Sequence, residues 1–253
     1  MTKSFLNAKE PFITEMIQAP SIQLSKTKIE NAIKDGATAI GLQLSYLDKE
    51  IRTEKNLREL FESTKDKPVY VTNYRNHKNN GTSDEVLLEE LIKTLDYGAT
   101  LLDVMGDAFN PSPEELTTDA KAIAKQMKFI ERVHKQGGEV LMSSHVRQFR
   151  NAERVLEIAL EHQRRGADVV KIVTGANTQE EEIKNLEICR ILKQELKVPF
   201  LFLAKGKYTY LHRMVGPALG VNMWLCFREY DQTTYEGPPL LADVIKIKQG
   251  FKL

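Results

Sequence analysis

The chain has 253 residues and nearly balanced charge, with a formal net charge of +1 at pH 7. This balance gives no reason to expect a nucleic-acid or acidic-membrane partner. No run approaches the ~18 apolar residues of a membrane span, and the N-terminal segment lacks the apolar core of a signal peptide, so we expect a cytoplasmic protein. The two cysteines, Cys189 and Cys226, have no CxxC spacing, so neither a disulfide framework nor a structural zinc site is expected.

Short apolar runs predict eight strands, and segments with helical spacing separate nearly all of them. In chain order the predicted strands are FITEMIQ (12–18), TAIGLQLS (38–45), VYVTNY (69–74), TLLDVMG (100–106), EVLMSSH (139–145), ADVVKIV (167–173), PFLFLA (199–204) and VNMWLCF (221–227). Strands that alternate with helices favour a parallel sheet, and eight such units in a chain of this length favour closure into a barrel. No GxGxxG motif supports a Rossmann-type sheet. The sequence therefore predicts an α/β fold, a single-domain (β/α)8 TIM barrel over residues 1–253.

Lys171 lies within the apolar run GADVVKIV (166–173), which is typical of a strand buried on both faces. A lysine in that place must be paired with an opposite charge, or it loses its proton more readily because burial disfavours the charged form. A partly neutral lysine is a nucleophile that forms a Schiff base with a ketone or an aldehyde. The alternative is a lysine that only forms an ion pair with a neighbour.

Several predicted strands end in polar groups, and catalytic side chains of such barrels come from the carboxyl ends of the strands. His145 closes the fifth predicted strand and Lys171 lies in the sixth, so adjacent strands would hold them side by side. Imine formation and loss of a β-leaving group both need proton transfers, to which a histidine is suited. Asp103 on the fourth strand is a further possible base, or it bonds to loop amides.

The segment SSH (143–145), followed by an amphipathic helix and then by GADVVKIV, resembles type I 3-dehydroquinate dehydratase. This resemblance implies a (β/α)8 barrel, commonly a homodimer, that converts 3-dehydroquinate to 3-dehydroshikimate through a lysine imine without a cofactor or a metal. By the same likeness Lys171 is the expected Schiff-base nucleophile, and His145 is the expected general acid and base.

The resemblance also implies four substrate-binding positions. Arg213, in the stretch AKGKYTYLHR, corresponds to the arginine that binds the substrate carboxylate, and a guanidinium is well matched to an anion. Arg75 is retained after the third strand. Gln43 stands in place of the arginine of a Glu-x-Arg-x-Asp motif, and Asn79 stands in place of the glutamate that supports the catalytic histidine.

The chain departs from the family pattern mainly at groups that would contact substrate hydroxyls. GLQLS (41–45) lacks all three charges of the second-strand motif, and Pro239 stands about where the family has a glutamine that contacts substrate. Losing a partner for one hydroxyl costs ~1–3 kcal/mol. The sequence thus predicts a Schiff-base dehydratase of 3-dehydroquinate or a related small anionic keto acid. Two alternatives stay open: a Schiff-base aldolase or dehydratase with a different anionic keto substrate, for which Lys205 and Lys207 could bind a phosphate, and a catalytically silent metabolite-binding barrel.

Overall fold

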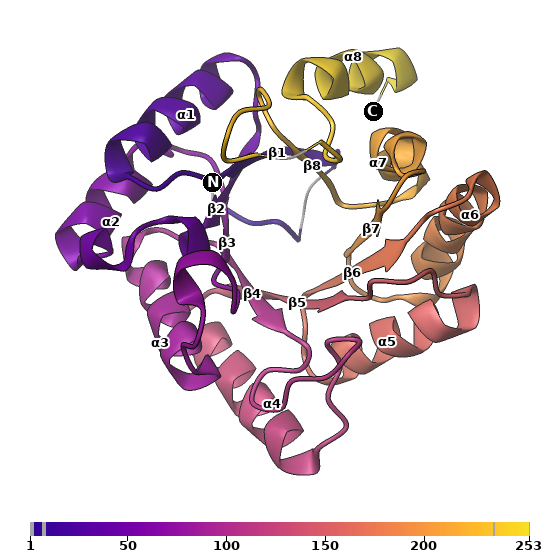
Figure 1. Ribbon diagram of the computed structural model, residues 1–253, viewed down its shortest axis with the longest axis horizontal. Coiled ribbons are helices and arrows are strands. Elements are labelled where there is room, and N and C mark those ends of the chain that lie inside the picture. The colour runs from indigo at the N-terminus through magenta and orange to yellow at the C-terminus, as the bar shows by residue number, and fades with distance from the viewer. Residues whose placement is uncertain (1–2, 7–8, 235, 253) are drawn as a thin grey trace.

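The computed structural model describes residues 3–6, 9–234 and 236–252. Within them eight parallel strands form a ring that is surrounded by helices (Figure 1). The strands are β1 (Phe12–Ile17), β2 (Ala39–Gln43), β3 (Val69–Thr72), β4 (Leu101–Met105), β5 (Glu139–His145), β6 (Val169–Gly175), β7 (Phe200–Lys205) and β8 (Met223–Cys226). Every predicted strand is present with its ends within two residues of the prediction, and the predicted (β/α)8 barrel is confirmed.

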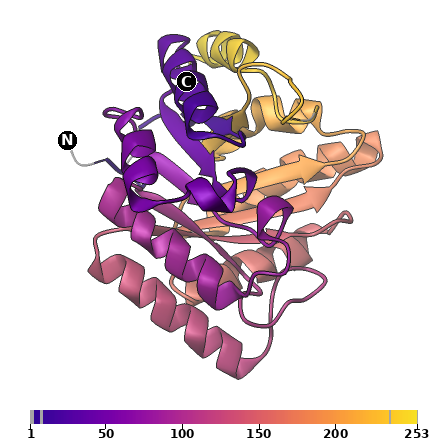
Figure 2. The same cartoon turned by 60° about the vertical axis from the view of Figure 1, so that its left-hand side comes forward.

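Each strand is followed by a helix that covers the outside of the barrel (Figure 2). The α-helices are α1 (Ile22–Lys34), α2 (Glu54–Glu62), α3 (Asp84–Lys93), α4 (Ala120–Lys135), α5 (Ala152–Arg164), α6 (Gln179–Glu195), α7 (Tyr210–Val215) and α8 (Leu241–Phe251). Short 3-10 helices span Leu44–Tyr46, Lys49–Ile51, His77–Asn79, Thr94–Tyr97 and Gly216–Leu219. The start of α6 is fixed by a capping box, in which Thr178 and Glu181 each bond the other's backbone N–H.

Backbone hydrogen bonds run from β8 through β1 and on to β7 in one continuous order. The ring closes where Asn222, just before β8, donates its backbone N–H to the carbonyl of Phe200 at 2.8 Å. Closure removes exposed strand edges and directs the carboxyl ends of all eight strands to one face. That face therefore gathers the polar residues that follow the strands.

Two apolar layers hold the barrel together. One lies between strands and helices, where α4 buries Phe129, Ile130 and Val133. The other lies inside the ring, because residues two apart on a strand point to the same face. Fully buried side chains in this interior include Leu101, Leu141, Val169 and Leu201.

The N-terminal segment covers the amino-terminal end of the ring. Phe5 is completely buried, and its backbone N–H donates to Glu139 at 2.9 Å at the start of β5. Asn222 donates its side-chain amide to the Phe5 carbonyl at 3.2 Å. In the part of the chain that the structure describes, no helix is long and apolar enough to cross a membrane.

Candidate active site

Lys171 lies inside the barrel with only 4% of its surface exposed. Its ammonium donates to the hydroxyls of Tyr74 at 2.6 Å and Tyr70 at 2.9 Å, and it contacts Asp103 Oδ2 at 3.1 Å. Asp103 also accepts hydrogen bonds from both phenols, and from Ser143 at 2.5 Å. Of the two interpretations of Lys171 from the sequence, pairing with an opposite charge is therefore realised, and the partner is Asp103 rather than a surface neighbour.

The charges in this cluster balance each other. Burial raises the pKa of the Asp103 carboxyl, but the Lys171 charge and the hydrogen bonds from Ser143, Tyr70 and Tyr74 outweigh burial and leave that pKa below its ordinary value. Burial and then the Asp103 charge raise the pKa of both phenols well above the ordinary range. At neutral pH the cluster thus holds an ionised carboxylate and two neutral hydroxyls beside the Lys171 amine.

His145 ends β5 and is held by a carboxylate. Its ring Nδ1 lies 2.6 Å from Glu115 Oε2, and its backbone N–H donates to the same oxygen at 3.1 Å. Burial raises the pKa of Glu115, but the charge and the two hydrogen bonds of His145 outweigh burial. The net result is a pKa below the ordinary value. Glu115 thus holds Nδ1, and Nε2 is the ring nitrogen that this carboxylate does not contact.

His145 and Lys171 stand at different depths of the barrel. Lys171 pairs in register with Ser143, and His145 pairs with Val173, so the histidine lies one inward-facing position nearer the carboxyl ends. Among the described residues no hydrogen bond joins the two, contrary to the side-by-side placement expected from the sequence. Tyr74 connects them instead: its hydroxyl contacts Lys171, and its ring packs edge-on against the imidazole with centroids 5.2 Å apart.

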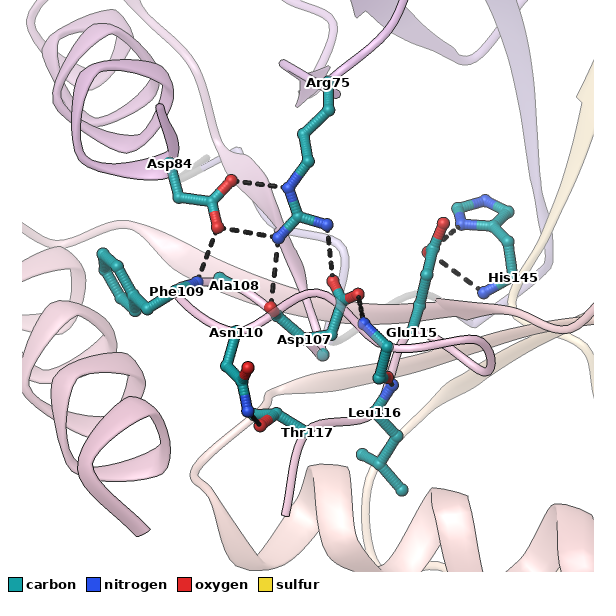
Figure 3. A network of polar contacts seen from close by, with 12 residues as sticks. Arg75, Asp84, Asp107, Ala108, Phe109, Asn110, Glu115, Leu116, Thr117 and His145 are labelled. Atoms are coloured by element: carbon teal, nitrogen blue, oxygen red, sulfur yellow. Dashed lines mark hydrogen bonds and ion pairs between the residues drawn. The ribbon is translucent and has the colours of Figure 1, made fainter. Parts of the chain in front are cut away.

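Glu115 reaches His145 because the long loop between β4 and α4 is tied down along its length (Figure 3). Arg75 donates to Asp107 in this loop at 2.8 Å and to both oxygens of Asp84 at 2.6 and 2.7 Å. Asp107 accepts the backbone N–H of Ser112 at 2.6 Å. The contacts of Asp107 thus fix the first part of the loop. Glu115 lies farther along the same loop and contacts His145.

The Glu115 backbone is also fixed, in a conformation that is uncommon for a residue with a side chain. Its φ is +49°, in the left-handed region. The Ser144 hydroxyl donates to the Glu115 carbonyl at 2.7 Å and lies 3.0 Å from His162 Nε2. Burial, followed by the charge of Arg165, lowers the pKa of His162 to about 3, so this buried histidine is neutral at pH 7.

Two of the expected substrate-binding residues have their hydrogen-bonding groups directed at protein. Arg75 directs its guanidinium to Asp84 and Asp107 as described above. Asn79 is fully buried; it accepts from Arg52 at 2.8 Å and donates to the carbonyl of Tyr74 at 2.8 Å. In the structure Arg75 fixes the β4–α4 loop and Asn79 fixes the backbone of Tyr74.

The other two expected residues lie nearer the barrel mouth. Gln43 ends β2 and accepts a hydrogen bond from the side-chain amide of Gln18, whose own oxygen is buried with no partner among the described residues. Arg213, on α7, is anchored through Nε to the carbonyl of Ala204 at 2.8 Å near the end of β7. Lys205 is exposed at the end of the same strand, as is Lys207 beyond it.

A family model described as type I 3-dehydroquinase matches residues 15–230. The chain belongs to the type I 3-dehydroquinase family. A curated relative, the 3-dehydroquinate dehydratase of Alkaliphilus oremlandii (strain OhILAs), is 33% identical over 122 residues, which are 47% of this chain and 47% of the relative. The match thus spans about half the length of that relative.

Solved structures of the family share the fold at low sequence identity. The 3-dehydroquinate dehydratase of Geobacillus kaustophilus HTA426 superposes with a TM-score of 0.80 at 15% identity, covering 99% of this chain and 96% of the other. The type I enzyme of Clostridium difficile, solved with covalently modified comenic acid, gives 0.81 at 15% identity over 99% and 98%. The likeness therefore shows that this chain shares the barrel fold of these proteins.

Three residues that contact Lys171 or His145 were not singled out from the sequence: Glu115, Tyr70 and Tyr74. Both tyrosines belong to the run VYVTNY (69–74), which predicts a strand. Their phenols are the signal in this run, because a buried hydroxyl usually needs a polar partner. Glu115 lies in an aperiodic segment, where the only signal is the acidic pair of PEE (113–115) in a loop after a barrel strand.

Two hollows on the outer surface do not involve the Lys171 cluster. One, of about 410 Å³, lies beside α8, and the other, of about 250 Å³, lies between α3 and α4. No group of three or more His, Cys, Asp or Glu with the spacing of a metal site occurs among the described residues.

Proposed function

We propose that the chain is a Schiff-base dehydratase that acts on 3-dehydroquinate or a closely related cyclic keto acid. The observation that carries this proposal is the Lys171 cluster, in which a primary amine stands inside a type I 3-dehydroquinase barrel among groups that exchange protons. A primary amine that can be deprotonated adds to a ketone and then loses water to give an imine.

The next step is removal of a proton from the carbon adjacent to the imine. A protonated imine withdraws electrons and acidifies that C–H, so a base of moderate strength is sufficient. His145 is proposed as this base, and the same imidazolium then protonates the hydroxyl that leaves from the β carbon as water. Asp103 stays next to the imine nitrogen and stabilises its positive charge as it stabilises the Lys171 ammonium.

Glu115 is proposed to orient His145 for this transfer. A carboxylate on Nδ1 fixes the tautomer and ring orientation and stabilises the imidazolium that forms when Nε2 takes a proton. The resemblance placed such a glutamate at position 79, but that position holds Asn79. Glu115 supplies the carboxylate from a different loop.

Recognition of the anionic group is assigned to Arg213, which the family resemblance places at the carboxylate-binding position and whose Nε is anchored on the Ala204 carbonyl. The oxygen of Gln18, next to Gln43 and without a partner among the described residues, is proposed to accept a hydrogen bond from a substrate hydroxyl. Arg75 and Asn79 have no part in substrate binding in this proposal, because protein groups occupy their donors and acceptors.

A related substrate with different hydroxyl recognition remains the second candidate. The observation that favours it is at Gly41, where the family carries the glutamate of its second-strand motif. A Cβ at this position would lie 2.3 Å from the sulfur of Met16, so Met16 occupies the space that an acidic side chain would need.

The expected homodimer and cytoplasmic location belong to the same proposal, and light scattering on the purified protein tests the dimer.

The function is tested by following the absorbance of the conjugated enone product after 3-dehydroquinate is added. The wild-type protein should form it, and the paired variant Lys171→Met/Asp103→Asn should not. Both charges are removed together because removal of one partner leaves the other buried without a counter-ion. Circular dichroism confirms the fold of the variant, and turnover by the folded variant would refute the assigned role of Lys171.

A further inference from the structure

The hydroxyls of Tyr70 and Tyr74 both contact the Lys171 amine, but only one of the two side chains is partly exposed. Tyr70 is completely buried on β3. Tyr74 follows the end of β3, is partly exposed, and packs against His145. Its hydroxyl accepts from Lys171 at 2.6 Å and donates to Asp103 Oδ2 at 2.5 Å, whereas the direct contact between Lys171 and Asp103 is longer, at 3.1 Å.

We propose that Tyr74 is a catalytic residue that carries protons between Lys171, Asp103 and the oxygen of the substrate ketone. This inference rests on the proposed imine chemistry and adds a group that neither the family resemblance nor the comparisons assign. Its basis is the continuous path Nζ–Oη–Oδ2, which ends on a carboxylate and passes through the hydroxyl of a partly exposed side chain that packs against His145.

The first transfer activates the amine. Lys171 gives one ammonium proton to the Tyr74 oxygen as the Tyr74 hydroxyl gives its own proton to Asp103. The products are a neutral amine, an unchanged phenol and a neutral carboxylic acid. Because burial and the Asp103 charge raise the pKa of Tyr74 well above its ordinary value, the phenol keeps a proton to pass on at neutral pH.

The second transfer returns that proton. The neutral amine adds to the ketone carbon, and one N–H proton moves to the former carbonyl oxygen, which gives a neutral carbinolamine. The proton held by Asp103 then passes through Tyr74 to this hydroxyl, which leaves as water while the C=N bond forms. One proton remains on nitrogen, so the positively charged imine again faces an ionised Asp103, and atoms and charge balance.

The fold holds Tyr74 in place through its backbone. Asn79 donates its side-chain amide to the Tyr74 carbonyl at 2.8 Å and to Asn73 at 2.8 Å, and Arg52 in turn donates to Asn79 at 2.8 Å. These hydrogen bonds fix the backbone of Tyr74 and do not use its hydroxyl, which contacts Lys171 and Asp103. This arrangement accounts for Asn79 in the place where the family carries a glutamate.

The test measures how fast Lys171 is trapped by borohydride with 3-dehydroquinate, in the variants Tyr74→Phe and Tyr70→Phe. General acid–base catalysis contributes ~10²–10⁴-fold, so Tyr74→Phe should slow adduct formation by roughly a hundredfold or more. Tyr70→Phe is the matched control, because its hydroxyl has the same two partners but no access to the mouth, and it should slow the reaction by less than about tenfold.

A second measurement separates proton transfer from mere positioning. Fluorinated tyrosines placed at position 74 keep the hydroxyl and its hydrogen bonds but make the phenol more acidic, so the trapping rate should change stepwise with each added fluorine. Equal rates for wild type and Tyr74→Phe, equal losses in both phenylalanine variants, or no response to fluorination would each overturn the role of Tyr74. Absence of any adduct in the wild type would instead overturn the proposed imine function, and this inference with it.

Discussion

Replacing Glu115 by glutamine tests how much the carboxylate on His145 contributes. Glutamine can still accept both hydrogen bonds that Oε2 accepts, so the variant removes the charge and keeps the shape. A hydrogen bond to a charged group contributes ~1.5–3 kcal/mol and a neutral one ~0.5–1.5, a difference of roughly 1–1.5 kcal/mol. The two side chains expose 32% and 29% of their surface, so solvent screening places the loss at ~1 kcal/mol.

That loss corresponds to a roughly five- to tenfold lower kcat for Glu115→Gln, with KM within about threefold of the wild type. Steady-state kinetics with 3-dehydroquinate measures both parameters.

The adjacent residue provides a matched control for loop integrity. Glu114 lies in the same loop, but its carboxylate binds Arg150 at 2.6 Å and Arg154 at 2.6 Å and does not contact His145. Glu114→Gln should therefore leave kcat and KM within about twofold of the wild type. Equal losses in the two variants, or an unchanged Glu115→Gln enzyme, would refute the reasoning.

Three further predictions concern neighbouring groups. Arg75→Ala should lower the free energy of unfolding in urea by ~2–4 kcal/mol, because it strands two buried carboxylates, and a rise in KM with unchanged stability would instead show substrate binding. Arg213→Gln should raise KM about 10–100-fold with little change in kcat, and an unchanged KM would remove Arg213 from the site. The pKa of His162 is about 3 in the folded protein and near 6.5 when unfolded, so acid favours unfolding between these values. The stability advantage of wild type over His162→Gln in urea should hence shrink by ~2 kcal/mol from pH 7 to pH 5, and a constant difference would contradict the assignment.

The barrel could be predicted from the sequence because its signals are local. Alternation of apolar runs with helical spacing indicates the strands. Lys171 was therefore placed correctly within the sixth strand and His145 at the end of the fifth. Whether Lys171 would be paired could not be decided, because its partner Asp103 lies two strands away in the sheet and 68 residues away in the chain.

The details of the site could not be predicted because they depend on irregular backbone. Glu115 reaches His145 only through a loop that is clamped by Arg75 and adopts a positive φ, and no periodic pattern encodes that path. Arg75 shows the converse problem: the resemblance suggested a substrate contact, but the side chain lies between Asp84 and Asp107. The sequence shows that an arginine is present at position 75, but only the fold shows that its guanidinium binds Asp84 and Asp107.

The imine on Lys171 is the central claim, and one measurement tests it directly. The protein is incubated with 3-dehydroquinate, reduced with borohydride, digested, and mapped by mass spectrometry. The account predicts one reduced adduct, on the peptide that contains Lys171, and none in the Lys171→Met/Asp103→Asn variant. An adduct on another lysine, or turnover of 3-dehydroquinate without any adduct at Lys171, would contradict it.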